Sequence, residues 1–542
     1  MTRAEGRRHY LTVKLVIVHY HLRPGGIRRI IELAVPHLVR QSPHPITRVV
    51  LATGQRAERP WHDHFAQQLH GVPVEVLVEP SFHYLSEQRG SRQRITAQLR
   101  GALAKILADV DAGNCLVWAH NLGVGRNLLL SRELAAACAR RDLPLVSHHH
   151  DWWFDTRWAR WPEMRRLGFR TLAAAARAVF PETNRVLHAA INHADASVLA
   201  RHVSPRAVWL PNLTEPAPLP AAQSVRAARR WLRTRLAPDD APVWLLPCRT
   251  LRRKNIAEAL LLTRWLRPEA WLAVTGAASS AEELPYFRAL ETAAHTHHWR
   301  LRLGVLAGDE TRKPGVPELL AASEAVLLTS LQEGFGLSFL EAAAAQRPLI
   351  ARRLPNIAPD LRRFGFRFPQ AYDEILVAPE MFDGKVELVR QQKRFSQWRA
   401  TMPAFARARV PTPWFLANRA ACAVPFSRLT LAAQLEVLAH PAHETWTTCM
   451  PLNPFLAVWR RRAAAKKLLV TPWPRTAKGW LGGAAYAQRF FAALSLTQRV
   501  ATHPTNPQTK IPPFSPLKLQ SDFINSKLDA QNLYPLLWTT RA

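Results

Sequence analysis

Short apolar runs alternate with longer amphipathic segments in two successive series along this chain of 542 residues. The first series starts with the apolar run 11–19, a glycine turn and an amphipathic segment at 27–39. The second starts at 243–246 and continues to 348–351. A buried strand, a turn and an amphipathic helix form the repeating unit of parallel α/β sheets. We therefore expect an α/β fold of two Rossmann-like, doubly wound domains, whose ligands bind beyond the carboxyl ends of the strands.

A segment rich in Pro, Ala and charged residues separates the two series and is typical of an inter-domain connection. The C-terminal part is basic, because 451–542 holds thirteen Lys and Arg residues against two acidic ones, and only 484–494 shows clear helical spacing. We expect an N-terminal domain at 1–212 and a linker at 213–241. A second domain at 242–400 would face the first across a cleft, and a partly irregular C-terminal extension would occupy 401–542.

The whole chain carries a formal net charge of +33. Arginine supplies 61 of the 73 basic residues, so the excess reflects either a polyanion-binding surface or a bias toward arginine. The five cysteines are widely spaced and form no CxxC pair, which argues against a disulfide framework and a zinc site. Because no signal peptide or apolar stretch of about 18 residues is evident, we expect a cytoplasmic protein, with peripheral contact at the inner face of the membrane as an option.

The most informative stretch, LLTSLQEGFGLSFLEA, runs from Leu327 to Ala342. An expected strand ends at Ser330, a loop with two glycines follows, and a helix starts near Gly336. Glycines let the backbone approach a ligand closely, and a helix N-terminus offers unpaired N–H groups to an anion. Two carboxylates, Glu333 and Glu341, flank this turn. This geometry suits one acid that contacts a sugar and one that contacts a ribose.

A second candidate site follows the first strand of the second domain, where PCRTLRRKN spans 247–255. A cationic cluster between a strand and a helix can stabilise negative charge, such as that of a phosphate group. The cations of this run include Arg249 and Lys254. The alternative is a solvated basic turn in an arginine-rich chain.

Other motifs carry weaker signals. Three consecutive histidines at 148–150 are not expected to bind metal, because adjacent strand residues point to opposite faces and no partner set at metal-ligand spacing is evident. The Asp109-Val110-Asp111 triplet is interpreted as a solvated turn. The segment 152–160 joins Trp and Phe residues with arginines and could stack on bases, a sugar or a lipid interface. We prefer an acceptor-facing or membrane-facing role for it over nucleic acid.

The stretch from Glu333 to Ala342, followed by a small-residue helix and the strand at 348–351, resembles the Glu-x7-Glu motif of GT-B fold glycosyltransferases. The similarity is greatest to the retaining family 4, the glycosyl transferases group 1. It covers about 11–400 in the order of elements and is strongest at 325–351. Asn255 and Gln346 stand where the family often has Gly.

The resemblance implies roles for individual residues. Glu333 would bind donor-sugar hydroxyls and Glu341 the ribose. Backbone N–H groups of Phe335 and Gly336 would face the diphosphate. Arg249 and Lys254 would clamp the donor phosphates, and the loop of Gly25 and Gly26 would lie near them. His150 would place a catalytic imidazole near the donor sugar. Gly334 and Leu337 would complete the donor-binding loop.

The expected function is that of a retaining hexosyltransferase, in class EC 2.4, which uses a nucleoside-diphosphate sugar as donor and needs neither metal nor cofactor. Arg249, Lys254, Glu333 and His150 are the expected catalytic residues. The acceptor, a glycan, a lipid-linked molecule or a small molecule, is left open, and nucleic acid is not expected as a partner. The alternative is a non-catalytic GT-B relative or a basic protein that binds polyanions or nucleic acid.

Overall fold

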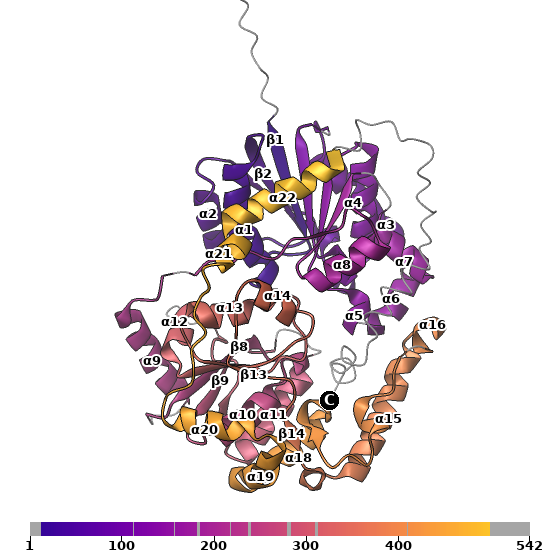
Figure 1. Cartoon of the computed structure of the whole chain (residues 1–542). Helices are drawn as coiled ribbons and strands as arrows, with labels where there is room; N and C mark the ends of the chain where they lie inside the picture. Colours follow the sequence, from indigo (N-terminus) through magenta and orange to yellow (C-terminus); the bar gives the residue numbers. More distant parts are fainter. Residues whose placement is uncertain are drawn as a thin grey trace, which may run out of the picture. The chain divides into compact units, whose positions relative to one another are not determined.

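The computed structural model describes residues 12–111, 113–156, 158–181, 185–216, 218–236, 240–278, 283–308, 313–408 and 410–498. These residues form two compact units (Figure 1). Unit 1 contains the described residues up to Thr214 together with 478–498, and unit 2 contains Glu215–Ala477. The chain therefore returns to its first unit after completing the second.

Unit 1 is built on a seven-stranded sheet in which all pairs are parallel. The apolar runs of the sequence form its strands because a parallel sheet covered on both faces buries both sides of each strand. In sheet order the strands are β3 (Val74–Val78), β2 (Ile46–Thr53), β1 (Val13–His19), β4 (Cys115–His120), β5 (Leu145–His149), β6 (Val186–Ala190) and β7 (Val208–Trp209).

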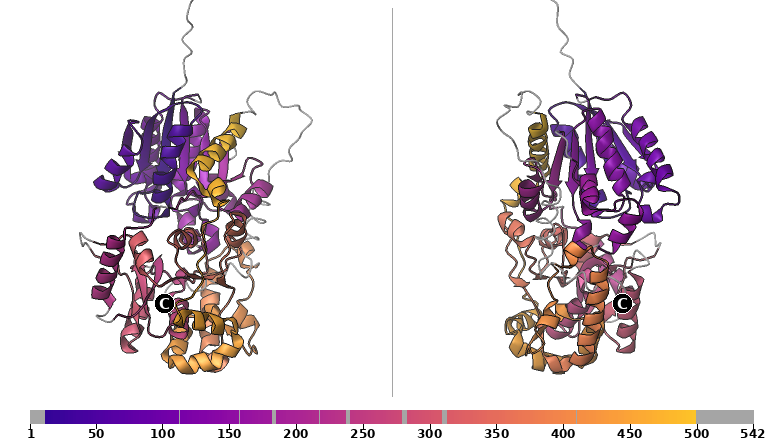
Figure 2. Two further views of the ribbon diagram at one scale, coloured as in Figure 1. Left: turned by 60° about the vertical axis from the view of Figure 1, so that its left-hand side comes forward. Right: turned by 90° about the vertical axis from the view of Figure 1, so that its right-hand side faces the viewer.

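Helices cover both faces of this sheet, as Figure 2 shows from two sides. The helices of unit 1 are α1 (Gly26–Gln41), α2 (Arg59–Gln67), α3 (Arg92–Ile106), α4 (Leu128–Arg140), α5 (Trp153–Thr156), α6 (Trp161–Arg166), α7 (Leu172–Val179), α8 (His193–His202), α21 (Ala477–Leu481) and α22 (Gly483–Gln498).

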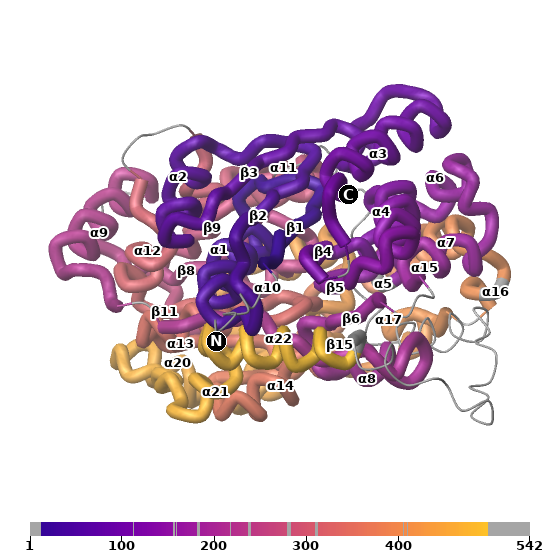
Figure 3. The backbone as a smooth tube through the Cα atoms, turned by 90° about the horizontal axis from the view of Figure 1, so that it is seen from above, coloured from indigo at the N-terminus to yellow at the C-terminus, as the bar shows by residue number. Residues whose placement is uncertain are grey.

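The helical pattern at 484–494 is confirmed as α22, which packs beside α1 although about 440 positions separate the two in sequence (Figure 3). Its rings of Tyr486 and Phe490 are buried. Phe490 meets the Trp118 ring of β4 edge-on, at 5.4 Å between ring centroids. This helix thereby completes the apolar cover of the N-terminal sheet.

Unit 2 contains a second parallel sheet of six strands. In sheet order these are β10 (Leu301–Arg302), β9 (Trp271–Gly276), β8 (Val243–Arg249), β11 (Ala325–Leu328), β12 (Leu349–Arg352) and β13 (Gln370–Tyr372). A short antiparallel pair, β14 (Leu376–Val377) and β15 (Val424–Pro425), forms a separate two-stranded sheet. The fold class expected from the sequence is thus confirmed.

The helices of unit 2 extend beyond the expected domain limits. The segment predicted as a linker holds α9, which packs against α12 of this unit, and residues after 400 continue in it. Its helices are α9 (Ala222–Leu236), α10 (Ile256–Leu266), α11 (Leu284–Thr296), α12 (Val316–Ala322), α13 (Leu337–Ala344), α14 (Ala358–Arg363), α15 (Gly384–Ala400), α16 (Ala404–Arg407), α17 (Trp414–Ala417), α18 (Leu431–Ala439), α19 (Ala442–Cys449) and α20 (Phe455–Ala464).

A buried ion-pair network fixes the centre of unit 2. The Arg352 guanidinium at the end of β12 donates to both carboxylate oxygens of Glu258 on α10, at 2.5 and 2.6 Å. It also donates to Glu374 at 2.7 Å. Among the described residues, none of the helices has the length and apolar character needed to cross a bilayer.

Candidate functional site

The carboxyl end of β8 carries the cationic segment predicted as a phosphate site. A short 3-10 helix, η5 (Arg252–Lys254), links this strand to α10. Asn255 joins η5 to α10 with a φ of 51°, in the left-handed region. Asparagine is one of the few residues other than glycine that adopts this conformation readily. The replacement of the family's usual glycine by Asn255 therefore leaves the turn intact.

Lys254 and Arg253 hold Glu333 between them. The Lys254 Nζ atom donates to Glu333 Oε1, and Arg253 Nη1 lies 3.4 Å from Glu333 Oε2. Arg253 also donates to the Gln332 carbonyl at 2.9 Å. The segments after β8 and β11 are therefore joined by charge-assisted contacts at the carboxyl end of the sheet.

The Glu333 carboxylate is charged throughout the physiological range. Burial acts to raise the pKa of Glu333, but Lys254 and Arg253, with a hydrogen bond from the Ser330 hydroxyl, outweigh it and lower the pKa to about 2. The Asn356 side chain donates to the Glu333 carbonyl at 2.7 Å and fixes the loop backbone. A carboxylate held in this way can accept hydrogen bonds from hydroxyl groups.

Gly336 begins α13 in a conformation that glycine favours. Its φ is 84°, and a Cβ atom there would lie 2.7 Å from Ile357 Cδ1. Phe335 is buried beside it, and Gly334 is half-buried. The loop thus delivers the chain to the amino end of α13, where the first N–H groups have no partner within the helix. This is the expected place for an anion.

Leu337 and Glu341 follow on α13. Leu337 is its first residue, and Glu341 lies one turn further along. Both side chains are half-buried. Glu341 is thereby positioned on the same helix whose amino end follows Glu333, as the spacing predicts.

Arg249 ends β8 and is more exposed than its neighbours. Its side chain is 56% exposed, and its Nη1 atom lies 3.8 Å from Glu283 Oε1. Burial raises the pKa of the Cys248 thiol to about 12, and Lys254, Arg253 and Arg249 all lie near enough to act on that thiol electrostatically. Arg249 therefore belongs to the same positive region as Lys254.

Arg252 has a structural position, unlike the other cations of the cluster. Its side chain is buried and donates to Asn255 at 3.3 Å and to the Leu429 carbonyl at 3.1 Å. Sequence reasoning missed Arg253, Ser330 and Asn356 as contacts of Glu333. Only Arg253 had a signal, as a member of the basic run.

In unit 1, Gly25 and Gly26 lie where β1 passes into α1. Gly25 is extended and Gly26 opens the helix. A Cβ atom at Gly26 would meet no atom within 4 Å, and one at Gly25 only the Arg23 carbonyl, at 3.9 Å. Packing within the described chain does not require glycine at these two positions. Close approach of a ligand to the backbone would be another reason for glycine here.

His150 lies directly after β5 and is buried. Its Nε2 atom is 3.2 Å from Nδ1 of His120, and its backbone N–H donates to Asn121 Oδ1 at 3.3 Å. Burial and neighbouring imidazoles hold the pKa of His150 well below 6.5. The ring is therefore neutral.

From the sequence there was no reason to expect a group of histidines that could bind a metal, but the structure contains one. His148 and His150 lie at alternate positions and share a face, and His120 of the neighbouring strand β4 lies beside them. His120, His148 and His150 each present a ring nitrogen within 4.8 Å of the others. The expectation considered spacing along the chain, whereas the register of β4 against β5 creates the group.

The interpretation of 152–160 as an exposed aromatic platform is wrong. The rings of Trp152, Trp153, Phe154 and Trp158 are all at most 5% exposed. Trp152 donates through Nε1 to Asp195 at 2.9 Å, and Trp153 and Trp158 pack edge-on. Consecutive aromatic residues here fill the core of unit 1, so these rings offer no surface to an acceptor or a membrane.

The Asp109-Val110-Asp111 triplet is confirmed as a turn. Asp109 has a φ of 55°, and Asp111 Oδ1 accepts backbone hydrogen bonds from Gly113 at 2.8 Å and Asn114 at 3.2 Å. These hydrogen bonds stabilise the connection between α3 and β4. The triplet therefore has a local structural role.

Comparison with known families identifies the segment that contains the Glu333 site. Residues 229–363 match the family model of the glycosyl transferases group 1. The match covers about a quarter of the chain. Arg249, Lys254, Glu333 and Glu341 all fall within it. Glycosyl transfer is the chemistry that this match supports.

A relative of similar sequence extends the likeness beyond this segment. Mannosylglucosyl-3-phosphoglycerate synthase of Petrotoga mobilis is 23% identical over 373 residues, which cover 67% of this chain and 69% of the relative.

Two solved structures have a similar fold over most of the chain. HepE of Anabaena, in complex with UDP and glucose, has a TM-score of 0.50 at 14% identity, over 89% of this chain and 99% of HepE. Sucrose-phosphate synthase of Thermosynechococcus elongatus has a TM-score of 0.52 at 13% identity, over 91% of this chain and all of that one. The chain has the GT-B fold of two Rossmann-like domains.

Proposed function

We propose that this protein transfers a hexosyl group from a nucleoside-diphosphate sugar to an acceptor hydroxyl, with retention of anomeric configuration. The observation that carries the proposal is the grouping of Glu333 with Lys254 and Arg253 at the amino side of α13, inside the glycosyl transferases group 1 segment. Unit 2 binds the donor. Unit 1, with Gly25, Gly26 and His150, takes part in acceptor binding and catalysis.

Positive charge at the end of β8 serves the leaving diphosphate. As the bond between sugar and phosphate breaks, charge builds up on the phosphate oxygen, and preorganised cations stabilise it. Lys254 has three N–H donors, so it can hold Glu333 and still donate to a phosphate. Arg249 is exposed enough to reach a ligand. With these groups and the amino end of α13, the diphosphate requires no divalent ion.

The two glutamates orient the donor. Glu333 is ionised and accepts from sugar hydroxyls, and Glu341 accepts from the ribose, as in the family that the motif resembles. Both Glu333 oxygens are already engaged by cations, which suits orientation better than covalent attack. Retention then follows from attack on the same face as the leaving group, with the leaving phosphate oxygen accepting the acceptor's proton.

The relatives suggest where to look for substrates. HepE was crystallised with UDP and glucose, so UDP-glucose is the first donor to test. The name of the Petrotoga relative contains a phosphoglycerate, a small phosphorylated molecule. Together with the chain's net charge of +33, it favours small anionic acceptors for the first screen.

A donor screen tests the proposal. The full chain is mixed with UDP-, GDP- and ADP-sugars, and thermal stability is followed. We expect one nucleotide class to raise the unfolding temperature, because a ligand that binds only the folded state stabilises it. The sugar nucleotide should raise the unfolding temperature of the wild type more than the free nucleoside diphosphate does. In Glu333→Gln this difference should be smaller.

The matched control is Glu444→Gln, which alters a glutamate of unit 2 whose side chain is 54% exposed on α19. It should respond like the wild type. If no sugar nucleotide stabilises the wild type, or if Glu333→Gln responds unchanged, the proposed donor site is wrong.

A further inference from the structure

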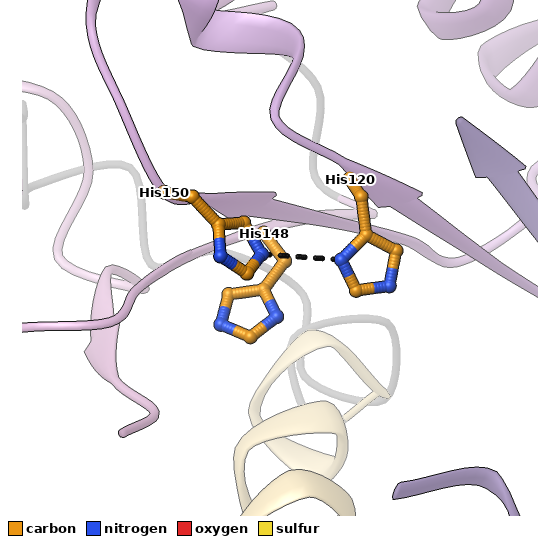
Figure 4. Close-up of side chains that lie close together, drawn as sticks. All are labelled: His120, His148 and His150. Atoms are coloured by element: carbon orange, nitrogen blue, oxygen red, sulfur yellow. Dashed lines mark hydrogen bonds between the residues drawn. The ribbon is translucent and has the colours of Figure 1, made fainter. Parts of the chain in front are cut away.

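Three buried histidines lie together on one face of the unit 1 sheet. His120, the last residue of β4, pairs directly with His148 of β5 in the parallel register, and His150 follows two positions later. Figure 4 shows the three rings gathered at the ends of these strands. Side chains at alternate strand positions share a face, so the strand pairing itself brings them together.

One of the distances between the rings matches that of a metal site. One ring nitrogen from each histidine lies within 4.8 Å of the other two. His120 Nδ1 and His150 Nε2 are 3.2 Å apart. Two nitrogen ligands of a tetrahedral zinc ion, each about 2.05 Å from the metal, lie about 3.3 Å apart.

The hydrogen bonds of His148 present a lone pair. Its Nε2 atom lies 3.3 Å from the Leu210 carbonyl, which can only accept, so Nε2 carries the proton. Nδ1 of the neutral ring is then unprotonated, and it is buried without a hydrogen-bond partner among the described residues. A metal-bound histidine commonly donates its other ring N–H to a backbone carbonyl in this way.

His120 and His150 face each other through ring nitrogens. His120 Nδ1 lies 3.2 Å from His150 Nε2, and the other nitrogen of His120, Nε2, is buried without a partner in the described part of the chain. The Asn121 side chain accepts from the backbone of His150 and of Asp151, at 3.3 and 2.9 Å, and ties the end of β5 to β4. The backbone at His150 is thus held beside the end of β4.

The three side chains are also shielded from solvent, because at most 8% of any of them is exposed.

We propose that His120, His148 and His150 bind one divalent transition-metal ion of the zinc class. Imidazole ligands select zinc and its first-row neighbours over magnesium or calcium, which prefer oxygen. Three protein ligands leave a fourth position for water or a ligand oxygen.

The residues assigned to the ion and to the diphosphate belong to different units. The diphosphate is assigned to Lys254, Arg249 and the amino end of α13, which are all in unit 2. A metal titration therefore reports on the histidines of unit 1, whereas the donor screen reports on Glu333 and its neighbours.

Cobalt titration of the full chain tests the proposal. After treatment with chelator and its removal, Co²⁺ alone is added and the visible absorption is recorded. We expect one equivalent to give the intense bands of tetrahedral cobalt and one equivalent of Zn²⁺ to abolish them. His120→Gln and His148→Gln should each weaken binding at least about 10-fold, the scale on which changes around a metal reduce affinity.

His188→Gln is the matched control. His188 is also buried on the same sheet, but it pairs with His149, 3.1 Å away, outside the group of three. This variant should bind cobalt like the wild type. Far-UV circular dichroism of each metal-free variant verifies that it folds.

Two results would overturn the proposal. The first is a wild-type titration without stoichiometric tetrahedral absorption, which decides the matter even if a variant fails to fold. The second is equal cobalt affinity in the wild type, His120→Gln and His148→Gln, which would assign the binding to other histidines among the 22 of the chain.

Discussion

Glu333 is the residue on which the donor site depends, and its ionisation contributes to stability. Its folded-state pKa of about 2 lies below the ordinary 4.5 because Lys254 and Arg253 outweigh its burial. The contribution is therefore complete above about pH 5 and is lost as the pH falls toward 2. Between pH 6 and pH 3 the loss amounts to about 2 kcal/mol.

Urea unfolding at these two pH values measures this effect. Glu333→Gln has no such carboxylate, so its free energy of unfolding should fall by about 2 kcal/mol less than that of the wild type. Glu444→Gln removes an exposed carboxylate and should behave like the wild type. Equal losses in the wild type and Glu333→Gln would show that the cations do not hold Glu333 ionised.

Individual residues also show what the sequence could reveal. The spacing of Glu333 and Glu341 around a glycine loop was sufficient to find the loop, and Lys254 followed from its place after a strand. Asn356 could not be found, because its contact with the Glu333 carbonyl depends on how a later loop folds back. Trp152 was misread because a pattern of aromatic and basic residues does not distinguish a surface from a core.

At the scale of elements, the start of α13 depends on Gly336. Gly336→Ala would place a side chain at a φ of 84° and 2.7 Å from Ile357 Cδ1. The left-handed conformation alone costs about 1–2 kcal/mol for a residue with a Cβ atom. We expect unfolding measurements to show at least this loss, and calorimetric titration to show weaker donor binding, because the amino end of α13 must shift.

Gly384→Ala is the control for this prediction. Gly384 opens α15 of the same unit, and a Cβ atom there would meet nothing within 4 Å. Its replacement should leave donor affinity unchanged. If Gly336→Ala keeps both the stability and the affinity of the wild type, the loop does not need the observed backbone conformation.

The strands and helices were easier to predict from the sequence than the way in which the strands pair. The strands and helices around the Glu333 loop follow from apolar periodicity, since each buried strand is a short apolar run. The group of three histidines instead depends on the pairing of His120 with His148, which no pattern within β5 contains. Register between strands is a tertiary property, so the sequence alone did not show it.

At the scale of the whole molecule, the chain ends its described part by returning to unit 1. Phe490 on α22 is buried against Trp118 of β4, so the N-terminal sheet depends on a helix that follows unit 2. Phe490→Ala should lower the free energy of unfolding by about 3–5 kcal/mol, as for other large core truncations. Chemical unfolding of the full chain measures it.

Leu496→Ala is the corresponding surface control on α22. Leu496 is 44% exposed, so its truncation should change the free energy of unfolding by no more than about 0.5 kcal/mol. A negligible effect of Phe490→Ala would mean that α22 does not stabilise unit 1. The helical pattern of this segment was evident in the sequence, but its partner was not, because hundreds of residues intervene.

Transfer of a sugar from a nucleotide donor is the central claim for the whole molecule, and proton NMR of the donor tests it most directly. The sugar nucleotide selected by the thermal screen is incubated with the full chain and candidate acceptors, and the anomeric signals are followed. We predict loss of the donor signal and a first product with the donor's anomeric configuration, with turnover reduced at least about 100-fold in Lys254→Ala, the scale of losing one preorganised charge contact. Inversion of configuration, or equal turnover by the wild type and Lys254→Ala, would contradict the account.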